Sequence, residues 1–327
     1  HFEDVQAYIA NGGDLVLVAS PRGRVPAATG RVFDDAALRE ELARLGIRNA
    51  RDLQDGFLMD RRGLEAYASL HPMRPNSDFF PILQLNAPVA RFMNRGVDLA
   101  SLQASPWALS GFLGGIPPRA LDEPPPAMQR PFLLDARQKA ARQLRAILLE
   151  GIPPSERSPD PAAIHRAQAL RSLGKECRMD QGVTRNLDLL LSVVGDTLPF
   201  LAAPEQAGLW QSPAWLACPP ADPVLQDALA LADAVSRHDH AGVISHGRAL
   251  LDRQGTAQLT EAKQASRYIA GSMLMAALAL GDRDQAMALY RAYWQKLPQS
   301  IREDDAIRLL LVLATTTPSR FGEGKVP

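Results

Sequence analysis

The sequence has few cysteines and few aromatic residues. Only two of its 327 residues are cysteine, Cys177 and Cys218, and they are single and far apart. This spacing matches neither the disulfide framework of a small secreted domain nor the closely spaced pairs of a zinc site. We therefore predict two buried thiols, because an unpaired cysteine packs like a small apolar side chain.

Net charge and long apolar runs are also lacking. The 36 basic and 36 acidic residues cancel, so no overall field draws the chain to nucleic acid or to an acidic membrane. No apolar run approaches the roughly 20 residues of a membrane-spanning helix, and no signal peptide is recognisable. The chain starts at His1 without an initiator methionine. We predict a soluble portion of a larger protein, and whether an upstream membrane region belongs to that protein stays open.

The motifs of common catalytic sites are missing. No Gly-x-Gly-x-x-Gly follows a strand-like run, and no Gly-x-Ser-x-Gly occurs. The histidine cluster, formed by His238, His240 and His246, lacks the i, i+3 or i, i+4 spacing of a metal site on one helix. We expect Asp239 to cap a helix beside exposed histidines, and we expect no metal.

Strand signals are confined to the first part of the chain. Residues 5–9 and 14–19 flank Asn11-Gly12-Gly13, which predicts a hairpin. The second run is apolar at successive positions from Leu15 to Val18, a pattern typical of a strand buried on both faces of a sheet. Two strands cannot provide that cover, so the sheet continues with later strands or with strands before His1.

Two helices and a third strand complete the predicted α/β part. A helix capped by Asp34 or Asp35 is expected to end at Gly46, and a second helix covers 60–70. The apolar stripe of the first helix is Leu38, Leu42 and Leu45. Residues 80–86 alternate as a strand, with Pro81 at its start.

Beyond Pro88 the pattern is almost purely helical. A helix is predicted over 99–112, followed by a proline-rich linker over 114–131. Asp-Pro pairs at 160–161 and 222–223 combine a capping carboxylate with a proline at the first helical position. Helices are predicted over 132–150, 162–177, 183–194, 224–237, 241–253, 260–280, 283–297 and 304–315.

The stretch 76–88 resembles the closing segment of the spermidine-synthase-like domain found in large bacterial membrane-fused proteins. That family has an Asn-Thr-Asp-Asp element, a proline, an alternating strand and Ala-Pro-Arg. The matching residues are Asn76, Asp78, Pro81, Leu83, Ala87 and Pro88, while Ser77, Phe79, Gln84 and Val89 depart from the pattern. Gly12-Gly13-Asp14 and Gly46-Ile47 fit the same order upstream, so the resemblance covers residues 1–95.

The resemblance implies the C-terminal end of a Rossmann-like methyltransferase fold. The complete family fold transfers an aminopropyl group from decarboxylated S-adenosylmethionine to a polyamine. Its cofactor-binding and catalytic residues lie in earlier strands, so we assign none here and expect an S-adenosylmethionine-type ligand only in a longer protein. Asn76 and Asp78 are the remaining site candidates, as turn-forming side chains or as ligand contacts.

A second resemblance is to tetratricopeptide-type helical repeats. Gly281-Asp282 separates two helices, Ala286 and Tyr290 follow with the Ala-x-x-x-aromatic spacing, and Pro298 closes the unit. The first helix of the unit lacks the expected tryptophan and Leu-Gly. A bespoke helical bundle and a repeat array therefore both remain open.

Together these observations predict a mixed, mainly α protein. Residues 1–95 form a small α/β remnant, 96–131 a helix and proline-rich linker, and 132–327 an all-α domain that is tetratricopeptide-like near 224–315. We expect a non-catalytic portion of a spermidine-synthase-like protein, with an upstream domain of the same protein as one partner. The alternative is a helical module that binds a protein partner; nucleic acid is not expected as a partner.

Overall fold

The computed structural model describes residues 2–10, 14–26, 30–70, 132–152, 160–210, 213–261, 263–302 and 304–316, together with Pro81, Pro88, Trp107, Arg119 and 122–123. The described chain is mainly helical with one small antiparallel sheet, which confirms the predicted fold class. The predicted strand over 80–86, the helix over 99–112, the linker over 114–131 and the tail after Pro318 lie outside these residues, apart from the single positions named.

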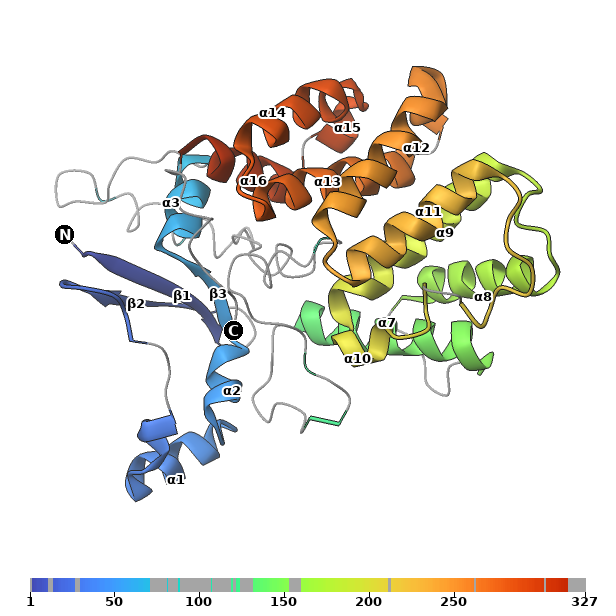
Figure 1. Cartoon of the computed structure of the whole chain (residues 1–327). Coiled ribbons are helices and arrows are strands. Elements are labelled where there is room, and N and C mark those ends of the chain that lie inside the picture. The colour runs from blue at the N-terminus through green and yellow to red at the C-terminus, as the bar shows by residue number, and fades with distance from the viewer. Residues whose placement is uncertain are drawn as a thin grey trace.

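The sheet has three strands in the order β2-β1-β3 (Figure 1). Strands β1 (Asp4–Ala10) and β2 (Asp14–Ser20) form the predicted hairpin, in the register that pairs Ala7 with Leu17. The short strand β3 (Phe57–Asp60) pairs with the other side of β1. Strand β3 was not predicted, because four residues are too few for a periodic signal and only pairing with β1 makes them a strand.

Among the strands that the structure describes, β2 lies at the edge of the sheet, and the prediction that it is buried on both faces was wrong. Leu15, Val16, Leu17 and Val18 are 43%, 45%, 57% and 41% exposed. On β1, by contrast, Ala7 is fully buried. The apolar run is present as expected, but the described elements do not cover it.

In the described residues before 71, three α-helices accompany the sheet, one more than predicted there. Helix α1 (Ala36–Arg44) starts at Asp35, whose carboxylate accepts hydrogen bonds from two helical backbone N–H groups, and Gly46 follows in the left-handed conformation as predicted. Helix α2 (Ala50–Gln54) was not predicted, and a capping box at Asn49 stabilises its N-terminal end. Helix α3 (Arg61–Leu70) was predicted. The stripe on α1 is not a core face, since Leu38 is 50% exposed and Leu45 lies beyond the last helical residue and is 62% exposed.

The part of the chain from residue 132 onward is built from helices, and local sequence signals determine where several of them begin. The Asp-Pro carboxylates cap α8 and α11 as predicted, by accepting from Ala163 N and Val224 N. The helices are α7 (Phe132–Glu150), α8 (Pro161–Lys175), α9 (Val183–Thr197), α10 (Ala203–Gln206), α11 (Pro223–Ser236), α12 (His240–Glu261), α13 (Lys263–Ala279), α14 (Arg283–Ala292), α15 (Gln299–Arg302) and α16 (Asp305–Thr316).

Helix α9 is central to this helical region. It contacts α7 and α8 on one side and α11 and α13 on the other, while α11–α12 and α13–α14 are antiparallel neighbours (Figure 1). Trp210, Trp215 and Trp294 are almost completely buried and belong to the core of this region. None of the helices in the described part of the chain is both long enough and apolar enough to cross a membrane.

The two parts of the chain contact each other through helices and through a buried charge cluster. Helix α3 packs against α16 (Figure 1). Arg119 is 4% exposed and donates to Asp52 at 2.6 Å and to Asp55 at 2.7 Å, which ties the segment before α7 to α2. Trp107 lies against Trp294, with ring centroids 6.3 Å apart. A buried charge is stable only when it is paired, so Arg119 fixes this junction.

Candidate functional site

The two site candidates named from the sequence, Asn76 and Asp78, lie outside the described residues. The structure therefore leaves them as predictions. Asp239 does cap a helix, as expected, because its carboxylate accepts from Gly242 N at 3.0 Å. Within the described ranges no three histidine, cysteine or acidic side chains gather as metal ligands would.

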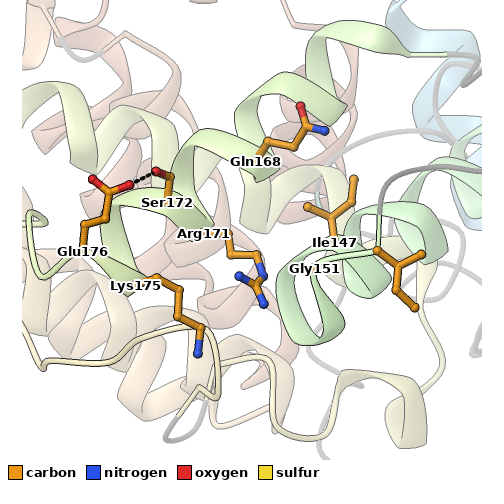
Figure 2. A pocket seen from close by; sticks show the side chains of 8 residues that line it. Ile147, Gly151, Gln168, Arg171, Ser172, Lys175 and Glu176 are labelled. Atoms are coloured by element: carbon orange, nitrogen blue, oxygen red, sulfur yellow. Dashed lines mark hydrogen bonds between the residues drawn. The ribbon is translucent and has the colours of Figure 1, made fainter.

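A groove between the C-terminal end of α7 and the outer face of α8 is the first candidate site (Figure 2). Its volume is about 340 Å³, at the lower end of the range of small-molecule pockets. The α7 side contributes Ile147, Gly151 and Ile152, and the α8 side contributes Gln168, Arg171, Ser172, Lys175 and Glu176. An apolar floor thus faces a polar, largely cationic wall.

Arg171 is the unusual member of this groove. Its guanidinium lies against Gly151, where an added Cβ would be 2.8 Å from Nη2 and 2.9 Å from Cζ. Gly151 also ends α7 in the left-handed conformation, with φ of 74°. A side chain at this position would be strained and would displace the guanidinium, so glycine serves both the helix end and Arg171.

The arginine has no partner among the residues that the structure describes, and its Nε–H is buried without an acceptor. Other arginines of the same helices are paired: Arg166 donates to Asp196 at 2.6 Å, and Arg142 donates to Glu205 at 2.9 Å. Burying a donor without an acceptor costs about 1–3 kcal/mol. The groove therefore holds a cation whose hydrogen bonds are incomplete.

The neighbouring charges do not neutralise Arg171. Glu176 accepts a hydrogen bond from Ser172 Oγ at 2.5 Å and pairs with Arg178. The hydrogen bond from Ser172 is the main cause that lowers the pKa of Glu176, so this carboxylate is ionised but engaged elsewhere. Lys175 Nζ donates to Ala214 O at 2.8 Å, which leaves other N–H donors of the ammonium group for the groove.

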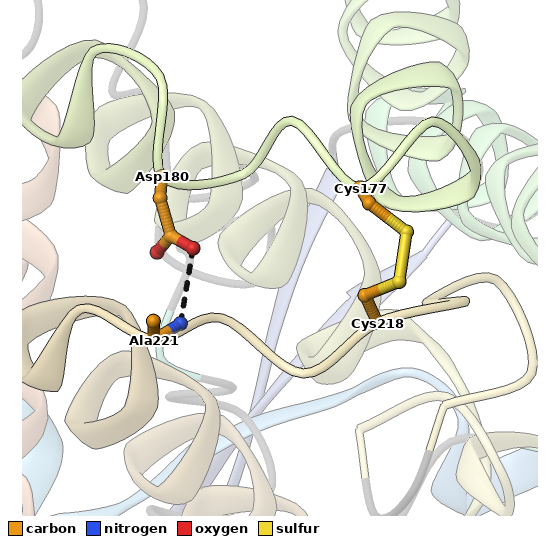
Figure 3. Close-up of a disulfide and its surroundings, with 4 residues drawn as sticks. All are labelled: Cys177, Asp180, Cys218 and Ala221. Carbon is orange, nitrogen blue, oxygen red and sulfur yellow. Dashed lines mark hydrogen bonds between the residues drawn. A yellow bond between two sulfur atoms is a disulfide. The ribbon is translucent and has the colours of Figure 1, made fainter.

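A disulfide beside the groove corrects the prediction of two free thiols. Cys177 and Cys218 are bonded to each other, with Cα atoms 5.3 Å apart (Figure 3). Cys177 follows α8, and Cys218 lies in the segment 213–222 that crosses the end of that helix. Asp180 fastens the same segment by accepting from Ala221 N and Asp222 N, each at 3.0 Å. The two cysteines are far apart in sequence, and only the packing of α8, α9 and this segment brings them together.

A second pocket, of about 490 Å³, lies between the 213–222 segment and α11. It is mainly apolar, and its lining includes Trp210, Leu216, Leu229 and Asp233. The indole N–H of Trp210 and one carboxylate oxygen of Asp233 are buried without partners. Because both atoms are shielded from solvent, this pocket offers a ligand fewer accessible polar groups than the groove at Arg171 does.

Comparison with protein-family models, with curated proteins and with solved structures found no match to this chain. Its function is therefore inferred from its own residues.

Sequence reasoning missed the groove, although one signal was present. Gly151 directly follows a strongly periodic helix, a position typical of a helix end. Nothing in the sequence placed Arg171 against that glycine, because the contact depends on how α7 and α8 cross.

Proposed function

We propose that this chain is a non-catalytic association module of a larger spermidine-synthase-like protein. Its sheet accepts a further strand at the open edge of β2, and its helical region is a scaffold for a protein partner. The observation that carries the proposal is the exposed aliphatic run from Leu15 to Val18 at that edge.

The run is exposed on both faces of the sheet. In the β1–β2 register Leu15 and Leu17 lie opposite Ile9 and Ala7, on one face, while Val16 and Val18 belong to the other. Fully burying one aliphatic side chain is worth about 1.5–3 kcal/mol, so covering the exposed half of four is worth roughly 3–6 kcal/mol. This gain favours association.

The edge also lacks the usual protection against pairing. Natural edge strands carry lysine, proline, inward-pointing charges or bulges that prevent a further strand from adding. Strand β2 has a single charged residue, Asp14, at one end, and it pairs with β1 without a bulge. Its occupant is a β-strand with aliphatic side chains on both faces, supplied by a neighbouring domain. The resemblance of residues 1–95 to the end of a larger sheet supports the same occupant.

The scaffold role of the helical region is favoured by its successive helix hairpins. Between α13 and α14, Gly281 adopts the left-handed conformation and Asp282 caps the second helix. Ala286 is 1% exposed and lets the paired helices approach closely, and Tyr290 is partly buried against the core. Stacked hairpins of this kind present extended surfaces to protein partners.

Sedimentation velocity of the whole chain tests whether the open edge of β2 pairs with a further strand. Among the strands that the structure describes, β2 itself is of the required kind, so the β2 of a second copy can occupy the edge in an isolated chain. Antiparallel pairing centred on Leu17 places aliphatic residues opposite one another and Asp14 opposite Ser20, so no like charges face each other. We expect wild-type protein to associate as its concentration rises, and Leu17→Lys to stay monomeric.

Leu280→Lys is the matched control, because Leu280 is 53% exposed but lies at the end of a helix. It should associate like the wild type. A wild-type chain that is monomeric at every concentration, or a Leu17→Lys variant that associates equally, contradicts the proposal.

Titration calorimetry tests the non-catalytic part of the proposal. Decarboxylated S-adenosylmethionine and methylthioadenosine should give no binding heat with this chain, since the family's cofactor-binding residues lie in earlier strands. Saturable binding of either compound would show that a cofactor site is present and that this part is wrong.

A further inference from the structure

We propose that the groove between α7 and α8 is a binding site for the carboxylate of a small aliphatic acid, with Arg171 as its principal ligand. This site is independent of the β2 edge and goes beyond the association role.

The charge of the ligand follows from the incomplete bonding of Arg171. The guanidinium has no hydrogen bond or ion pair among the described residues, and only its Nε is shielded from solvent. The terminal nitrogens are therefore accessible from the groove. A guanidinium presents its N–H groups as a planar fork that fits the two oxygens of a carboxylate.

A second cation reinforces the same preference. Lys175 lies one turn after Arg171 on α8, so both side chains project from one face of that helix into the groove (Figure 2). The bond from Lys175 Nζ to Ala214 O holds the ammonium group in place. Among the described residues of the lining the one carboxylate is that of Glu176, which points toward Ser172 and is occupied there (Figure 2). Of the lining residues that the structure describes, an anion entering the groove meets two cations and no free negative side chain.

The apolar residues at the base of the groove indicate that the ligand carries an aliphatic chain. Ile147 is buried beneath the groove, while Ile152 is 51% exposed at its rim. A short hydrocarbon chain lying over Ile152 would remove that surface from water. The volume of about 340 Å³ admits a small molecule or a single side chain, and not a folded domain.

The position of the groove explains how an unpaired cation is tolerated without ligand. The C-terminal end of α7 carries a negative partial charge, which favours a cation placed against Gly151. The dipole does not complete the hydrogen bonds of the guanidinium, however. Ligand binding would complete them.

Nuclear magnetic resonance titration of the whole chain with sodium hexanoate tests the site. We expect saturable shifts of the Arg171 Nε–H signal and of the Ile152 methyl signal, with a Kd on the order of 1 mM, as for other small weak ligands. Acetate should bind more weakly because it lacks the chain, and hexanol should not bind because it lacks the charge. Shifts that are absent, or that avoid these two residues, would overturn the assignment.

A titration with inorganic phosphate distinguishes a site for carboxylates from a site that binds any anion. If phosphate bound as tightly as hexanoate, the aliphatic-acid assignment would be wrong. Raising the salt concentration should weaken hexanoate binding, since part of the attraction is between charges.

Two variants and one control make the test independent of folding. Arg171→Gln should weaken hexanoate binding at least about tenfold, which is the loss expected for a charged hydrogen bond. It should leave the melting temperature unchanged or raise it, whereas a purely structural arginine would lower it. Ile152→Asp, at an exposed position, should weaken binding by adding a like charge. Arg185→Gln, exposed on α9, should bind like the wild type. Unchanged affinity in the first two variants would refute the site.

Discussion

Opening the disulfide between Cys177 and Cys218 should destabilise the helical region strongly. The bond closes a loop with a sequence separation of 41 residues. In the chain-entropy model such a loop is worth about 4 kcal/mol, because the crosslink restricts the unfolded chain. For a region of this size, 4 kcal/mol corresponds to a decrease in melting temperature of roughly 8–16 °C.

The native structure near the bond should survive its loss. Asp180 still accepts from Ala221 N and Asp222 N, and Ala217 N still donates to Gly174 O at 3.1 Å. Both cysteines are exposed, so Cys177→Ser and Cys218→Ser bury no new hydroxyl. The effect therefore reports the crosslink and not a disrupted core.

Thermal melting followed by circular dichroism measures this effect. Wild-type protein with a reductant and the Cys177→Ser/Cys218→Ser double variant should melt at the same lowered temperature, and reductant should not change the double variant. Two titratable thiols in air-oxidised wild-type protein, or a melting temperature insensitive to reductant, would show that the disulfide does not stabilise the helical region. A stabilising disulfide is also typical of proteins that work in an oxidising compartment.

Three further predictions concern other parts of the fold. Burial, the larger cause, and the nearby His238 lower the pKa of His240. The unfolded state therefore binds more protons than the folded state, and the stability of the fold should decrease as the pH falls below about 6.5. The imidazole signal of His240 in the folded protein should titrate below that pH. Gly271→Ala should destabilise by about 1–3 kcal/mol, because the new Cβ would lie 2.4 Å from the rigid indole of Trp107. Gly247→Ala, whose Cβ would lie 2.5 Å from Met273 Sδ and 3.3 Å from Ile269 Cγ2, should cost less in the same urea melts, because a methionine side chain adapts more readily than an indole. Replacing Arg119 with methionine removes the cation that the buried carboxylates of Asp52 and Asp55 share and should cost about 3–5 kcal/mol, and a melting temperature equal to wild type would contradict this.

Features that depend on neighbouring residues in the chain were predictable from the sequence. The bounds of α7 were predicted residue for residue, since its apolar stripe is periodic and Gly151 follows it. The carboxylates of Asp160, Asp222 and Asp239 cap their helices because a cap needs only the next few residues. The mainly α class followed from the same signals.

Features that depend on distant residues were not predictable in this way. The disulfide requires the segment 213–222 to cross the end of α8, and β3 exists only because β1 lies beside it. The run from Leu15 to Val18 was identified as apolar, but its place at an edge depends on strand order. The groove at Arg171 likewise depends on how two helices cross.

Amide hydrogen exchange of strand β2 tests the association role most directly. It is measured on the whole chain at a low and at a high protein concentration. We predict that the amides of β2 that point away from β1, which alternate along residues 15–18, exchange more slowly at high concentration, because a second strand then pairs with the open edge. The Leu17→Lys variant should show no such difference. Equal exchange rates of these amides at both concentrations in the wild-type chain would contradict the account.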